Sequence, residues 1–141
     1  MKLMKILFYL IILTFVSNNL LAKNNYFNEG LTLFENQKFD KAKFKFEQDI
    51  VHNPKNEKSY LYLSKIFNIK KEKELEEQNL NTVILLDPKN EEAVFSLAKL
   101  KLEESDYIES KKMIENLLKF CKNYCQKSSE LKTQIDQSLK K

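Results

Sequence analysis

The sequence predicts an all-α fold in which pairs of helices stack side by side as a solenoid. The segment Asn53 to Asn56 recurs almost unchanged as Asp87 to Asn90, and the only two prolines of the chain lie in these two copies. The sequence around these prolines has the apolar spacing of helices. The interval between the copies matches the period of about 34 residues that is typical of helix-turn-helix units, which bury their apolar faces against their neighbours.

Residues 1–22 are interpreted as a signal peptide that precedes the fold. Lys2 and Lys5 stand before an apolar run at 6–16, which ends at polar Ser17 and is much shorter than the ~20 residues that a membrane-spanning helix needs. We expect cleavage after Ala22, with an uncleaved membrane anchor as the alternative. Export would place the protein in the periplasm or in association with the cell envelope, as one domain beginning at residue 23.

After the signal peptide, residues 23–124 divide into three units of equal length, 23–56, 57–90 and 91–124. The second departs from the first at Lys73 and Glu76, and the third has Lys122 where the others have proline. The packing residues of the first unit are Tyr26, Gly30, Leu33, Phe39, Ala42, Phe46 and Pro54. This pattern resembles the tetratricopeptide-repeat (TPR) family, which has an aromatic residue and an alanine at the two departing positions of the second unit.

Local signals support the helix boundaries in chain order. The residue before a proline avoids helical backbone, so helices end before each proline, and Asn56 and Asn90 can cap the helices that follow. Asp106, with Glu109 three residues later, is a capping box for the second helix of the third unit. We expect helices at 24–36, 40–52, 57–71, 73–86, 90–104 and 107–121, and a solvated capping helix within 125–141.

Gly30 is the only glycine of the chain and lies in the middle of an expected helix. Glycine in a helix costs about 1 kcal/mol relative to alanine. We therefore expect the second helix of the first pair to approach the backbone closely at this position.

The resemblance implies a right-handed α-solenoid in which the first helix of each pair lines a concave groove. The apolar groove residues would bury apolar parts of a partner, and Lys65 and Lys99 would bind an acidic group. In the alternative, the C-terminal helix or a second subunit covers the strip. The family's contact positions give a predicted groove of Phe27, Leu31, Phe34, Leu61, Lys65, Asn68, Phe95, Lys99 and Leu102.

Composition excludes several functional classes. All 24 basic residues are lysine, so bidentate arginine recognition of phosphate or guanine is excluded. The net charge of +4, about +2 after removal of the signal peptide, gives no electrostatic reason to expect nucleic acid or an anionic membrane as a partner. No paired carboxylates, nucleophile elbow or glycine-rich phosphate loop occurs, so we predict no enzyme activity, cofactor or small-molecule substrate.

Cys121 and Cys125 are the only cysteines, and they stand on either side of the bend where the third unit lacks its proline. In an exported chain a structural disulfide is the favoured interpretation. Free buried thiols and redox catalysis are the alternatives. His52 is the only histidine, so a zinc site would need groups from separate units, and we predict no metal site.

These observations predict a non-enzymatic module or scaffold of a bacterial cell envelope that binds a protein or peptide partner in the concave groove. The clamp that chaperone-binding TPR proteins use is missing, since Phe27 and Leu31 occupy its first two positions. A cytosolic heat-shock co-chaperone is therefore disfavoured. The alternative is a structural protein that self-associates, with the groove buried in a homodimer.

Overall fold

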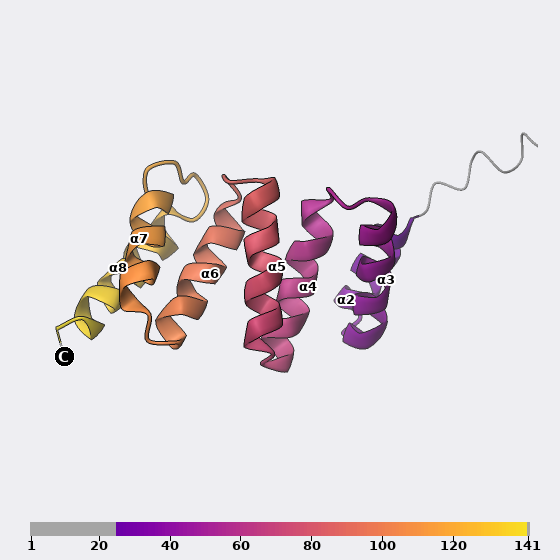
Figure 1. Cartoon of the computed structure of the whole chain (residues 1–141), viewed down its shortest axis with the longest axis horizontal. Coiled ribbons are helices and arrows are strands. Elements are labelled where there is room, and N and C mark those ends of the chain that lie inside the picture. Colours follow the sequence, from indigo (N-terminus) through magenta and orange to yellow (C-terminus); the bar gives the residue numbers. More distant parts are fainter. Residues whose placement is uncertain (1–24, 141) are drawn as a thin grey trace, which may run out of the picture.

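A computed structural model of the chain describes residues 25–140, and this part is an all-α solenoid (Figure 1). The predicted signal peptide, 1–22, lies outside the described residues. The helix pairs follow one another along the long axis in chain order. They are α2 (Tyr26–Glu35), α3 (Phe39–His52), α4 (Glu57–Lys70), α5 (Lys73–Leu86), α6 (Glu91–Glu103), α7 (Tyr107–Leu117) and α8 (Cys125–Ser138).

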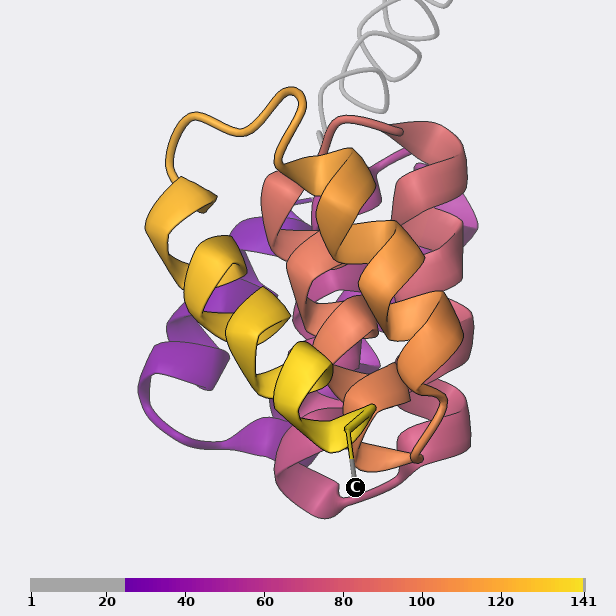
Figure 2. The ribbon, with the colours of Figure 1, turned by 90° about the vertical axis from the view of Figure 1, so that its left-hand side faces the viewer.

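The helices pack as three hairpins, α2 with α3, α4 with α5 and α6 with α7. Each hairpin contacts the next one, and α8 packs on α7 and touches α6. Figure 2, viewed along the stack, shows α8 lying across its end. The apolar core runs through the stack in three clusters, one between α2, α3 and α4, one between α4, α5 and α6, and one between α6, α7 and α8.

The predicted helices are confirmed, with one boundary corrected. The predicted caps are also confirmed, except that only one of the two hydrogen bonds of the capping box forms, because the Asp106 amide donates to the Lys101 carbonyl rather than to Glu109. The Asn56 side chain accepts a hydrogen bond from the Lys58 amide, and Asn90 caps α6 in the same way. Asp106 accepts from the Glu109 amide at the start of α7. Helix α7 ends at Leu117 rather than near 121, because the backbone amides at 122–124 donate to a side chain of α6 instead of continuing the helix.

The close approach expected at Gly30 is also confirmed. A Cβ atom at Gly30 would lie 2.7 Å from the ring of Phe46, which is fully buried on α3. The residues one and two repeats later are Ser64 and Ala98, both buried. The first helix of each pair therefore keeps a small residue where its partner helix packs against it.

The repeat is visible in the backbone of the turns inside each hairpin. Gln37, Lys71 and Ser105 occupy the same position of the three units, and all three have left-handed backbone with φ between 58° and 65°. This conformation ends a helix after its last turn and usually belongs to glycine. The chain uses it three times without a glycine, so the geometry of the turn comes from the packing of the two helices it joins.

Candidate functional site

A hollow of about 410 Å³ opens on the face of the stack lined mainly by α4 and α6. Helix α2 contributes one side chain, α5 contributes one, and the start of α8 forms one end. We call this hollow the groove. Its walls are Phe34, Ser64, Lys65, Asn68, Ile69, Glu76, Glu92, Phe95, Ser96, Lys99, Leu100, Glu103, Tyr124 and Lys127.

The groove contains five of the nine residues named from the sequence. Phe34 comes from α2, Lys65 and Asn68 from α4, and Phe95 and Lys99 from α6. First helices of all three pairs therefore contribute, as the resemblance implied for this kind of fold.

The other four residues do not line the groove. Leu61 is only 8% exposed and packs in the central core cluster, so it has almost no surface for a partner. The Phe27 ring packs against Phe46 in the first core cluster. Leu102 packs against the cluster that α8 completes, and Leu31 is half-buried outside the groove. The continuous apolar strip expected from repeat positions is therefore replaced by separate apolar side chains.

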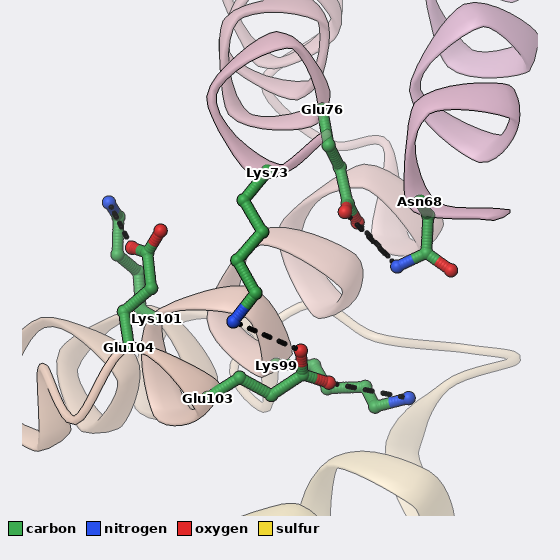
Figure 3. Close-up of polar contacts among 7 residues, drawn as sticks. All are labelled: Asn68, Lys73, Glu76, Lys99, Lys101, Glu103 and Glu104. Atoms are coloured by element: carbon green, nitrogen blue, oxygen red, sulfur yellow. Dashed lines mark hydrogen bonds and ion pairs between the residues drawn. The ribbon is translucent and has the colours of Figure 1, made fainter. Parts of the chain in front are cut away.

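The two lysines expected to bind an acidic group are already ion-paired. Lys65 Nζ lies 2.8 Å from Glu92 Oε1, which joins α4 to α6. Glu103 lies between two lysines, with its carboxylate 3.9 Å from Lys99 Nζ and 3.8 Å from Lys73 Nζ (Figure 3). These pairs offset much of the positive charge that the sequence suggested for the groove.

Glu76 lies in the groove wall at the end nearest the turn between α4 and α5 (Figure 3). The residue is only 5% exposed, and both of its carboxylate oxygens accept from Asn68 Nδ2, at 3.0 and 3.1 Å. Burial raises the pKa of the Glu76 carboxyl above its usual range, although the hydrogen bond from Asn68 acts in the opposite direction.

The opposite end of the groove is formed by Tyr124 and Lys127, where α8 begins. The Tyr124 ring packs 5.4 Å from the ring of Phe95, and Lys127 Nζ lies 5.0 Å from the centre of the Tyr124 ring. Tyr124 stands between Cys121 and Cys125, which the structure joins by a disulfide. Neither cysteine is a free thiol in this arrangement.

Glu91, the first residue of α6, holds the loop that leads into α8. Its carboxylate accepts three backbone hydrogen bonds, from Lys122 at 2.8 Å, Asn123 at 2.8 Å and Tyr124 at 2.9 Å. Desolvation alone would raise the pKa of Glu91, but the three amides outweigh it and hold the pKa below its usual range. A carboxylate of α6 therefore holds the loop that ends immediately before α8.

Sequence reasoning missed several groove residues. Ile69 is 48% exposed and follows Asn68 directly, but it falls between the family's contact positions. Tyr124 and Lys127 lie outside the contact positions of the family. Glu76 did carry a signal, since a glutamate replaces the alanine of the family pattern.

Residues 25–140 contain no group of three or more His, Cys, Asp or Glu side chains placed to hold a metal ion. Over the same residues, none of the helices combines the length and apolar character needed to cross a membrane.

Comparisons with known proteins bear on the fold. No protein-family model matches the sequence, and no curated protein matches it. Many solved structures are similar across most of this chain, among them the three that follow. The second TPR domain of human RPAP3, in complex with an HSP70 peptide, superposes with a TM-score of 0.69 at 17% identity, covering 79% of this chain and 92% of that domain. The chain has the tetratricopeptide-repeat fold.

The other two structures are of a yeast protein and of a bacterial secretion chaperone. The TPR2B domain of yeast Sti1, in a complex with pHsp70, has a TM-score of 0.69 at 14% identity, covering 79% of this chain and 94% of that one. The translocator chaperone SycD of the Yersinia enterocolitica type III secretion system, in an alternative dimer, has a TM-score of 0.74 at 13% identity, covering 85% and 96%. At such low identity the likeness establishes the TPR fold alone.

Proposed function

We propose that this chain is an exported, non-enzymatic interaction module of a bacterial cell envelope that binds a segment of a partner protein in the groove. The observation that carries the proposal is the groove itself, which is open and exposes apolar side chains, Ile69 above all. An exposed apolar surface rimmed by charged groups is typical of an interaction site.

The comparisons support peptide binding as the mode. The RPAP3 and Sti1 domains have their HSP70 peptide and pHsp70 bound, on the same fold. The clamp that the family uses for chaperone peptides is missing from this chain, because Phe27 and Leu31 occupy its first two positions. We therefore propose a different partner, a protein of the cell envelope.

The proposed location rests on the N-terminal sequence and on the cysteines. The lysines and the short apolar run of residues 1–22 have the order found in signal peptides. A disulfide between Cys121 and Cys125 is suited to an oxidising compartment. Mass spectrometry of the protein recovered from a periplasmic fraction tests both points. We expect a chain that begins at Lys23 and is two hydrogens lighter than its reduced form.

The binding proposal is tested with two matched variants of the chain that begins at Lys23. Ile69→Ser changes the groove, whereas Leu85→Ser changes an apolar residue that is 81% exposed outside it. Ile69 and Leu85 are each the second-last residue of their helix, so the two changes have similar costs for folding, within about 0.5 kcal/mol.

A partner is first captured by cross-linking in envelope fractions, purified, and titrated against each variant by calorimetry. We expect Ile69→Ser to weaken binding by about tenfold and Leu85→Ser to leave it unchanged. Equal affinities of both variants would mean that the groove is not the binding site.

Self-association is the second candidate, and the dimeric state of SycD on this fold favours considering it. In this case a second copy of the chain would occupy the groove. Sedimentation velocity distinguishes the two candidates, because an interaction module remains a monomer at micromolar concentration, whereas a self-associating protein forms a dimer that Ile69→Ser dissociates.

A further inference from the structure

The position of Glu76 in the repeat is one that the other two units fill with a small residue. Ala42, Glu76 and Ser110 are equivalent in the three units, and all three are buried. Ala42 has no polar group to satisfy, and the Ser110 hydroxyl donates to the carbonyl of Ala98 at 2.7 Å. Only the second unit places a carboxyl group there. Because alanine fits the position in the first unit, packing between the helices does not require a glutamate.

The carboxylate of Glu76 is incompletely satisfied. A carboxylate has about four lone-pair sites, yet a single nitrogen, Asn68 Nδ2, donates to both of its oxygens. Of the charged groups around it, Lys73 and Lys99 both lie within ion-pair distance of Glu103. Within residues 25–140, the ion pairs of the structure leave Glu76 without a lysine at that distance.

Although only 5% of Glu76 is exposed, its side chain forms part of the groove wall, which also includes the exposed Ile69. A buried carboxylate with a single donor destabilises the free protein. A cation that entered the groove would pair with it in a partly desolvated site, where the attraction is stronger than at an open surface. Such an energetic cost in the free protein is expected where a side chain is kept for binding.

We propose that Glu76 is a specificity-determining residue of the groove, which binds an ammonium or guanidinium group of the partner beside an apolar side chain seated on Ile69. This inference rests on the proposed function of the groove. It identifies the partner segment as one that carries a lysine or arginine next to an aromatic or aliphatic residue. An acidic group at the same place would meet the carboxylates of Glu76 and Glu103.

Three small probes that differ only in their polar end test the inference on the chain that begins at Lys23. They are 4-phenylbutylammonium, 4-phenylbutanol and 4-phenylbutanoate, which carry a cation, a neutral hydroxyl and an anion on the same apolar body. Binding at pH 7 is followed by NMR through the side-chain amide signal of Asn68, which donates to Glu76. We expect the ammonium to bind about fivefold more tightly than the alcohol, and the carboxylate to bind most weakly.

Two variants assign the preference to Glu76. Glu76→Gln keeps the size of the side chain and should reduce the preference for the ammonium over the alcohol to less than about twofold. Glu104→Gln is the matched control, because Glu104 is a carboxylate of the same region that pairs with Lys101 outside the groove (Figure 3). It should leave the preference unchanged.

The outcomes separate this inference from the proposed function. Equal binding of the alcohol and the ammonium, or tighter binding of the carboxylate, would overturn the role of Glu76 while leaving the groove as an apolar binding site. The same conclusion would follow if Glu76→Gln kept the full preference. If none of the three probes shifted groove signals, both the inference and the proposed function would be contradicted.

Discussion

The two turns that carry the repeated Pro-Lys-Asn motif lie next to different buried side chains. Beneath the first, between α3 and α4, Asp49 is 2% exposed, and its Oδ2 atom accepts from Ser59 Oγ and Asn56 Nδ2, each at 2.6 Å. Beneath the second, between α5 and α6, the positions one repeat after Asp49 and Ser59 hold Val83 and Ala93, which are fully buried in an apolar cluster.

This difference shows that the turn motif and the side chains buried beneath it have separate roles. Asn56 and Asn90 cap the following helix in both places, so the motif determines where each helix pair begins. The interior determines how the two pairs are joined. A buried carboxylate with specific donors accepts few replacements, whereas an apolar contact accepts many side chains of similar volume.

We call the contact beneath each repeated turn a junction, so that the first is polar at Asp49 and the second is apolar at Val83. The largest effect is expected when a polar side chain is placed in the apolar junction. Val83→Asp would bury a carboxylate without the donors that Asp49 has, so we expect a loss of about 4 kcal/mol or more in the free energy of unfolding. Urea unfolding followed by circular dichroism measures it. Adding Ala93→Ser reproduces the donor of the first junction and should recover part of the loss. A well-folded Val83→Asp single variant would show that the second junction is open to water.

The converse change breaks the polar junction. Asp49→Ala leaves the Ser59 hydroxyl and the Asn56 amide without their acceptor, and we expect a loss of about 3 kcal/mol. The double variant Asp49→Val with Ser59→Ala instead copies the second junction and should lie within about 1 kcal/mol of the wild type. Differential scanning calorimetry of all three proteins tests this. Equal losses in the single and double variants would mean that the contents of the two junctions are not interchangeable.

The third junction, between α7 and α8, lacks the proline and depends on Glu91 and the disulfide. Glu91→Gln should lower the protection of the backbone amides of Lys122 to Tyr124 in hydrogen exchange, with little change in α2 to α5. Because the pKa of Glu91 is lowered in the folded protein, its contribution is present above the usual carboxyl range and is lost as the pH falls through the folded value. Protection in the wild type that did not decrease in acid would contradict this role.

The smallest change in stability is expected at the turns inside the hairpins. These three turns have the same backbone conformation, unlike the junctions between hairpins. Glycine adopts left-handed backbone without the strain that a side chain causes there. We therefore expect a stabilisation of up to about 1 kcal/mol, and a higher melting temperature, from each of three variants, Gln37→Gly, Lys71→Gly and Ser105→Gly. Thermal unfolding of the three variants should give similar shifts. Widely different shifts would show that the turns are not equivalent.

Much of the fold follows from local signals in the sequence. The prolines, the capping asparagines and the aspartate at the start of α7 act over a few residues, so they place helix ends well. The end of α7 could not be predicted in this way. It depends on Glu91, which lies far earlier in the chain and meets the loop only after the stack has formed.

The groove was predicted less well because repeat positions describe an average repeat. Leu61 occupies a contact position, yet its neighbours in this chain bury it in the core. Leu102 is covered because α8 packs at that end of the stack. The exposure of Ile69 likewise depends on the particular side chains around it, which the period alone does not describe.

The way the helices contact one another has a consequence for how an occupant of the groove would act. The main contacts join only neighbouring helices, so the stack can open from α8 inward while α2 to α5 stay folded. An occupant would touch α2, α4, α6 and α8 at once. It would therefore connect parts of the chain that can otherwise open one after another, and the bound protein should unfold more cooperatively than the free one.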